Sequence, residues 1–148
     1  MRYCYECGEP APDIDGLPVC AEHGPRWKLV RNAPAADVLI VRGDRVLLSR
    51  RAIEPHRGTW ETPGGLQDLG EHPGDCARRE VLEELGVTVR LVDVLGIYLD
   101  AFEDGYGQTV VYLGEIDGEP GGGDHESLEW RWFSVDELPD ASGMAFSH

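Results

Sequence analysis

Hydrophobic residues fall into short runs from about residue 35 onward, and their spacing predicts an alternation of strands with one helix. We expect a hairpin in which residues 36–41 and 46–48 are the strands and residues 42–45, Arg-Gly-Asp-Arg, form the turn. Further runs rich in Val, Ile, Leu and Tyr, or in aromatic residues, predict strands over 87–99, 108–116 and 129–133. This pattern is typical of an α/β domain.

Residues 73–85 carry the signals of a helix. Pro73 suits a first-turn position, and Gly86 suits the position just past the last turn. Apolar residues recur every four positions along the segment: Ala77, Val81 and Leu85. This spacing places them in one stripe on one side of the helix, where they can pack on a sheet.

Glycine, proline and capping residues predict the connections between these elements. Residues 58–65 include Pro63-Gly64-Gly65 and are expected to form a loop, and residues 121–123 are three glycines that predict a flexible loop. The Ser-Val-Asp-Glu sequence at 134–137 is a capping box, so we expect a short helix to begin there.

The first 25 residues are dense in Cys, Gly and Pro and hold too few aliphatic residues for a core of their own. Cys4 and Cys7 are separated by two residues, as are Cys20 and His23, and a glycine follows each pair. Tetrahedral zinc takes four nitrogen or sulfur ligands, and two such pairs supply them. The alternative is a disulfide between two of the cysteines, with one left unpaired. This block resembles a zinc ribbon with a structural, closed metal site, and we predict domains over 1–26 and 27–148.

Composition narrows the class of protein. The chain has 148 residues and a formal net charge of −15, so it repels a phosphate backbone and general nucleic-acid binding is disfavoured. We find no apolar run long enough to cross a bilayer and no signal peptide, and we therefore expect a cytoplasmic protein. Eight of the 13 basic residues lie within 26–57, whereas residues 99–129 hold nine acids and no Lys or Arg. Either the acids serve solubility, or cations bind beside a basic site for a small anion.

Three carboxylates of the predicted helix share one face, because Glu80, Glu83 and Glu84 stand at i, i+3 and i+4. Two such charges about 6 Å apart repel by roughly 3 kcal/mol at an effective dielectric near 20. Arg79 can pair with Glu83 or with Glu71, and a divalent cation such as Mg²⁺ would relieve the rest. The alternative is a solvated acidic face. Cys76, on the same helix, is expected to be a small packed residue.

The spacing Gly65-x5-Glu71-x7-Arg79-Glu80-Val81-x-Glu83-Glu84-x-Gly86-Val87 fits the Nudix box at every defined position. The chain therefore resembles the Nudix (MutT-like) hydrolase family over about residues 34–140. The resemblance implies an α/β/α sandwich with a mixed sheet. It also implies hydrolysis, with Mg²⁺ or Mn²⁺, of a nucleoside diphosphate that is linked to another group.

The resemblance also assigns roles to particular residues. It implies that the metal ligands are Glu80, Glu83, Glu84 and the backbone carbonyl of Gly64, and that Arg79 and Glu71 orient the site. Glu126, six residues before Trp132, is the first candidate for the catalytic base or a further metal ligand. Glu129, in the same segment, is the other candidate, and Glu103 and Asp104 are weaker ones. Three arginines either grip phosphate groups or are simply exposed: Arg50, Arg51 and Arg57.

The substrate stays open at this stage. A zinc ribbon ahead of a Nudix domain is similar to NADH pyrophosphatases, but residues 99–104 read LDAFED where those carry an SQPW-type motif. We expect a small-molecule nucleoside diphosphate derivative as substrate, no nucleic-acid partner and no membrane, and we keep a homodimer as an expectation. The alternative function is a non-catalytic nucleotide-sensing module whose ribbon binds a partner. A pure sensor does not need the whole carboxylate set, so the sequence favours the enzyme.

Overall fold

The computed structural model of the chain describes residues 2–4, 6–25, 32–102, 105–121 and 125–146. The chain divides into two compact units, Met1–Arg31 and Asn32–His148. The predicted boundary between residues 26 and 27 falls outside the described residues and stays a prediction.

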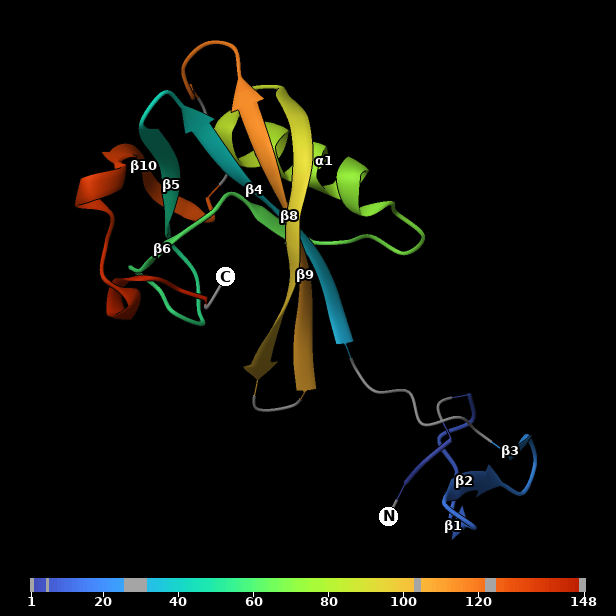
Figure 1. Cartoon of the computed structure of the whole chain (residues 1–148). Coiled ribbons are helices and arrows are strands. Elements are labelled where there is room, and N and C mark those ends of the chain that lie inside the picture. Colours follow the sequence, from blue (N-terminus) through green and yellow to red (C-terminus); the bar gives the residue numbers. More distant parts are fainter. Residues whose placement is uncertain (1, 5, 26–31, 103–104, 122–124, 147–148) are drawn as a thin grey trace. The chain divides into compact units, whose positions relative to one another are not determined.

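The N-terminal unit holds a small three-stranded antiparallel sheet (Figure 1). Its strands are β1 (Asp13–Ile14), β2 (Leu17–Cys20) and β3 (Gly24–Pro25), in the order β1-β2-β3. Among the described residues of this unit, the buried apolar cluster consists of Cys4, Ala11 and Cys20. A cluster of this size is too small to hold a fold without a further crosslink, so the two cysteines in it take on structural importance.

The second unit is built on a seven-stranded mixed sheet. Its main path runs β10 (Ser127–Ser134), β5 (Arg45–Arg51), β4 (Asn32–Arg42), β9 (Gly105–Ile116) and β8 (Val89–Phe102). Two short strands complete it, because β6 (Trp60–Glu61) pairs with β5 and β7 (Gly64–Leu66) pairs with β4. β4 and β9 pair in parallel and the other pairs are antiparallel, which makes the sheet mixed.

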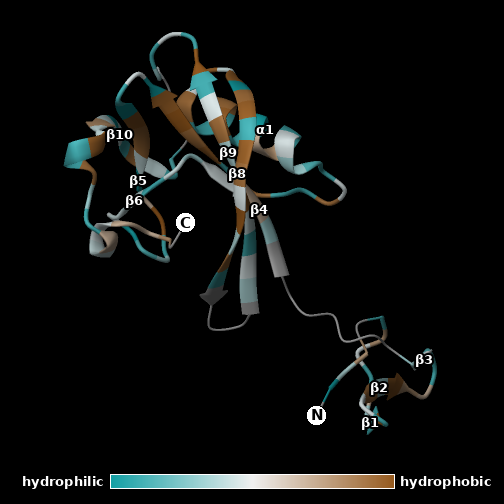
Figure 2. Cartoon of the chain, in the orientation of Figure 1, coloured by the Kyte–Doolittle hydropathy of each residue, from teal (hydrophilic) through white to brown (hydrophobic). Residues whose placement is uncertain are grey.

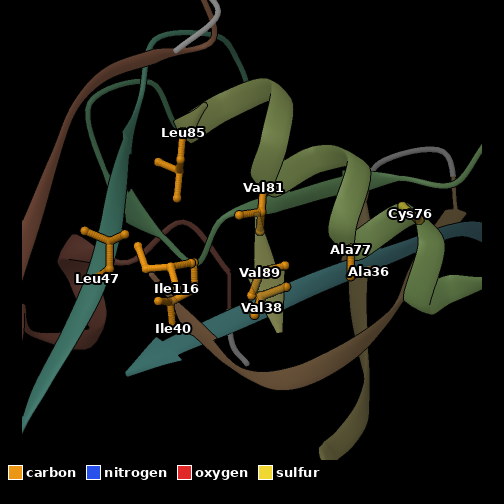
Figure 3. Packing of buried hydrophobic residues seen from close by; sticks show 10 residues of the cluster. All are labelled: Ala36, Val38, Ile40, Leu47, Cys76, Ala77, Val81, Leu85, Val89 and Ile116. Carbon is orange, nitrogen blue, oxygen red and sulfur yellow. The ribbon is translucent and has the colours of Figure 1, made fainter. Parts of the chain in front are cut away.

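Helix α1 (Pro73–Leu85) packs on this sheet and closes the core (Figures 1 and 3). Its apolar stripe meets inward-facing residues of β4, β5, β8 and β9, and Figure 2 shows hydrophobic residues gathered on these facing elements. The buried cluster comprises Ala36, Val38, Ile40, Leu47, Cys76, Ala77, Val81, Leu85, Val89 and Ile116. The core therefore holds the helix rigidly against the sheet, with the acidic positions of α1 beside β7.

The mixed sheet and its helix confirm the predicted fold. The helix spans the predicted residues, His72 caps its first turn by accepting a hydrogen bond from the Gly74 amide, and Gly86 ends it in the left-handed region at φ 67°. Within the described residues the other helical elements are two single-turn 3-10 helices, η1 (Val135–Glu137) and η2 (Ala141–Gly143). No helix in this part of the chain is long and apolar enough to span a membrane.

Two local predictions need correction. Residues 58–65 are not loop throughout, because they contain β6 and the start of β7; strands of two or three residues are too short to show a period in the sequence. The helix predicted after Ser134 does form as η1, but the Ser134 side chain makes no capping bond to the backbone and donates to the Glu137 carboxylate at 3.2 Å. Residues 122 and 123 of the predicted glycine loop lie outside the described part of the chain.

Candidate active site

Two acidic residues of α1, Glu80 and Glu84, lie directly against the glycines of β7. A Cβ atom added to Gly65 would lie 2.8 Å from the Glu80 carboxyl carbon, so a larger residue there would displace this carboxylate from its position. A Cβ atom on Gly64, whose φ is +157°, would lie 2.4 Å from an Asp37 carboxylate oxygen. The paired glycines therefore bring two acidic side chains from different elements against one stretch of backbone.

Arg79 connects four parts of this site through its guanidinium. Its Nε and Nη2 donate to the two carboxylate oxygens of Glu71 at 2.9 and 2.8 Å, a bidentate pair. Its Nη1 donates to Glu80 at 2.5 Å and to Glu83 at 3.1 Å, and Nη2 also reaches the Leu66 carbonyl at 3.0 Å. The bonds from Arg79 lower the pKa of Glu71 to about 2, so Glu71 stays ionised and holds the arginine in place.

Glu84 is a buried carboxylate with an unsatisfied oxygen. The residue is only 7% exposed, and its Oε1 accepts a hydrogen bond from the Gly64 amide at 3.2 Å. Its Oε2 is buried and has no hydrogen-bond partner among the described residues. Burial, followed by the charges of Glu61, Glu80 and Asp37, raises its pKa well above the ordinary value. A buried carboxylate oxygen without a donor costs free energy unless a cation or a proton satisfies it.

Two acids that the sequence reasoning did not single out belong to the same cluster. Asp37 on β4 is 7% exposed and accepts a hydrogen bond from the Thr62 hydroxyl at 2.9 Å. Glu61 on β6 is mostly buried, and burial raises its pKa to about 7 even though Arg51 donates to it at 2.6 Å. Asp37 interrupts an apolar strand between buried Ala36 and Val38, and a charged residue at such a position was the available signal.

Glu126 brings a further carboxylate to this cluster from the residue before β10. Its charge contributes to raising the pKa of both Glu61 and Glu80, so the three carboxylates lie near one another. Its backbone carbonyl accepts a hydrogen bond from the Ala52 amide at 2.6 Å, which anchors the segment. The other candidate, Glu129, pairs with Arg50 and Arg131 instead, and the weaker candidates at residues 103 and 104 lie outside the described part.

Most of these side chains line a cavity of about 620 Å³, whereas Glu84 and Glu71 are not among its lining residues. Its acidic lining consists of Asp37, Glu54, Glu61, Asp68, Glu80, Glu83, Asp100 and Glu126. The cavity is also lined by Gly64 and Gly65 and by two basic residues, Arg51 and Arg79. Two arginines therefore stand beside eight carboxylates. Carboxylate oxygens in excess of the basic groups are the ligands that Mg²⁺ and Mn²⁺ prefer, so the residues present fit a divalent cation.

The three candidate phosphate-binding arginines differ in position. Arg51 faces the cavity, is largely buried, and donates to Glu61 at 2.6 Å and to the Pro55 carbonyl at 2.8 Å. Arg50 points away from the cavity lining and donates to the Gly58 carbonyl at 2.8 Å and to Glu129 at 3.2 Å. Arg57 is exposed and does not line the cavity. The structure thus brings one of the three to the cavity. Arg50 and Arg51 differ because neighbouring residues of a strand point to opposite faces, and Arg57 lies in the loop after β5.

The N-terminal unit brings Cys4, Cys7, Cys20 and His23 together, with one ligand atom of each lying within 4.8 Å of the others. Cys7 Sγ lies 3.7 Å from Cys20 Sγ, and His23 Nδ1 lies 3.7 Å from both Cys4 Sγ and Cys20 Sγ. Sulfur atoms bound to one tetrahedral zinc at about 2.3 Å would lie roughly 3.8 Å apart, so the set fits zinc. All four cysteines of the chain are free thiols, and Cys76 is packed in the core as expected.

A NUDIX domain model matches residues 31–147, and the chain belongs to the NUDIX family. The relatives it resembles are hydrolases by name. It is 32% identical over 119 residues to an ADP-ribose pyrophosphatase of Methanocaldococcus jannaschii, covering 78% of this chain and 68% of that protein. It is 34% identical over 144 residues to the NAD-capped RNA hydrolase NudC of Pseudomonas fluorescens, covering 93% of this chain and 50% of that protein. The chain thus spans about half the length of the NudC relatives it matches.

Solved structures show the same fold. A NUDIX hydrolase from Nitrosomonas europaea is similar with a TM-score of 0.80 and 25% identity, over 99% of this chain and 84% of that one. A MutT NUDIX hydrolase from Burkholderia pseudomallei is similar with a TM-score of 0.70 and 29% identity, over 74% of this chain and 88% of that one. The predicted family and fold are therefore confirmed.

Proposed function

We propose that this chain hydrolyses the diphosphate linkage of a nucleoside diphosphate joined to another group, with Mg²⁺ or Mn²⁺ as cofactor. The observation that carries the proposal is the Glu84 carboxylate, which is buried with one oxygen unsatisfied inside a cluster of further carboxylates. A divalent cation satisfies that oxygen and offsets the mutual repulsion. A diphosphate is itself anionic, and it binds beside so many carboxylates only when cations lie between them.

Glu80, Glu83 and Glu84 are the proposed metal ligands, together with the Gly64 carbonyl. Their elements support this assignment, since the three carboxylates share the face of α1 that meets β7 and the Gly64 amide donates to Glu84. When bound, Mg²⁺ or Mn²⁺ neutralises phosphate oxygens and lowers the pKa of a coordinated water.

Glu126 is proposed as the base that accepts a proton from the attacking water, or as a further ligand. Its charge lies close enough to Glu61 and Glu80 to shift their pKa values, and it lines the cavity. Arg79 and Glu71 act by positioning, because Arg79 holds Glu80 and Glu83 while the bidentate pair with Glu71 fixes Arg79.

Arg51 is the arginine best placed to contact a phosphate group, since it faces the cavity from β5. Phosphate contact by Arg50 or Arg57 stays a prediction. The Cys4, Cys7, Cys20 and His23 set is proposed to hold a structural zinc, because four protein ligands leave no position open for water. The cytoplasmic location and the homodimer also stay predictions.

The relatives suggest the first substrates to test. ADP-ribose pyrophosphatase and NAD-capped RNA hydrolase are names of proteins about one third identical to this chain. Both substrates contain an adenosine diphosphate linked to another group. Capped RNA also tests the expectation that nucleic acid is not a partner. The net charge of −15 supports that expectation, because it repels a phosphate backbone.

The decisive experiment measures product release from ADP-ribose, NADH and NAD-capped RNA, each with Mg²⁺, with Mn²⁺ and with chelator. We expect metal-dependent cleavage of at least one, with a monophosphate as product. Glu84→Gln should abolish it, while Glu137→Gln, an exposed position outside the cavity lining, should not. Nucleotide binding without turnover of any diphosphate would instead support the sensing module.

A further inference from the structure

The cavity is lined by apolar groups as well as by carboxylates. Phe146 and Ile53, both partly buried, line it together with Pro55. These residues come from two segments far apart in the sequence, the loop after β5 and the segment after η2. These apolar residues have no role in the carboxylate cluster or among the proposed metal ligands.

Backbone contacts fix the segment that carries Phe146. The Ala145 amide donates to the Trp60 carbonyl at 2.8 Å, and Met144 forms a bridge with Trp60, so this segment runs along β6. The Phe146 ring meets the His56 ring edge-on, with centroids 5.6 Å apart at 84°. An aromatic side chain anchored in this way presents a defined apolar wall.

Arg51 links the apolar wall to the carboxylate cluster. Its guanidinium donates to Glu61 at 2.6 Å, and the same group lies 5.3 Å from the centroid of the Phe146 ring. A phosphate beside Arg51 would therefore lie close both to the carboxylate cluster and to the Phe146 ring. A nucleoside diphosphate has this same order of groups, with its phosphates next to a ribose and its planar base beyond.

We propose that Phe146 and Ile53 form the subsite that receives the planar base of the nucleotide, with Arg51 beside the adjacent phosphate. The inference rests on the proposed function, which it deepens by assigning the base-bearing half of the substrate to the part of the cavity lined by Phe146 and Ile53. The volume of about 620 Å³ falls within the roughly 300–1,000 Å³ typical of small-ligand pockets. Contact between a base and an aromatic side chain favours base-bearing ligands over base-free ones.

AMP and ribose 5-phosphate test this subsite, because they share the ribose and the phosphate and differ in the base. We would measure both affinities by calorimetry with Mg²⁺ present, for the wild type, Phe146→Ala and Phe146→Trp. The wild type should prefer AMP, and Phe146→Ala should reduce that preference by about tenfold. Phe146→Trp should retain it. Tyr106→Ala is the matched aromatic control, since Tyr106 is exposed and does not line the cavity.

The wild type supplies a second measurement that does not depend on a variant folding. An intermolecular NOE between adenine protons and the Phe146 ring supports the subsite, and its absence from an AMP-saturated sample overturns it. Equal affinity for the two ligands in the wild type, or an unchanged preference in Phe146→Ala, also overturns it. A protein that binds AMP with this preference but hydrolyses no diphosphate refutes the proposed function and leaves the base subsite standing.

Discussion

Replacing Glu61 by Gln removes one titrating group from the interior of the site and keeps its shape. Glu61 is mostly buried, and burial raises its pKa from 4.5 to about 7 although Arg51 donates to it. The Gln amide oxygen can still accept from Arg51. We expect the substitution to change how the stability of the metal-free protein depends on pH.

The sign follows from where the proton is held. Between pH 4.5 and about 7 the folded protein keeps the Glu61 proton while the unfolded chain releases it, so the free energy of unfolding falls as pH rises through this window. At about 1.4 kcal/mol per pH unit, the wild type should lose about 2 to 3 kcal/mol from Glu61 between pH 5 and pH 8. Glu61→Gln should not show this part of the loss.

The assay is urea unfolding followed by circular dichroism at pH 5 and pH 8, with chelator present. Comparing the pH difference in the two proteins cancels effects of the substitution that do not depend on pH, such as a weaker bond to Arg51. Glu137→Gln is the control, because it is the same change at an exposed position outside the cavity lining. If the free energy of unfolding changes equally between pH 5 and pH 8 in the wild type and in Glu61→Gln, the reasoning that burial makes the Glu61 charge unfavourable is refuted.

Three further predictions concern the metal sites. Glu84→Gln should lower Mg²⁺-dependent turnover by about 100-fold or more and raise the melting temperature of the metal-free protein, because a buried charge is removed; turnover near the wild-type level at saturating Mg²⁺ would contradict the ligand assignment. Arg79→Lys should lower kcat about tenfold, since a lysine cannot hold Glu71 and Glu80 at once through a planar fork, and steady-state kinetics checks this. Elemental analysis should find one zinc per chain in the wild type and none in Cys20→Ser, which should still hydrolyse the substrate. A zinc-free wild type would contradict the zinc site, and loss of hydrolysis together with zinc in Cys20→Ser would contradict the separate roles of the two metals.

Local sequence was sufficient for the elements whose cause is local. The helix over 73–85 follows from apolar residues every four positions and from Gly86, which alone tolerates the left-handed conformation there without cost. The shared helix face of the carboxylates follows from the same period. The clustering of two cysteine-containing pairs in the N-terminal unit was likewise predictable from spacing, because each pair occupies one tight turn.

Tertiary structure decided which acids are buried and which arginine faces them. Glu83 and Glu84 are adjacent glutamates, so the sequence does not distinguish them, yet Glu84 is buried against β7 while Glu83 is far more exposed. Asp37 on β4, Glu61 on β6 and Glu126 just before β10 come from three separate segments, and only the pairing of β4, β6 and β10 with β5 brings them to one cavity. Burial and proximity are properties of packing between distant segments, and the periods and caps read along a chain report only on neighbours within a few residues.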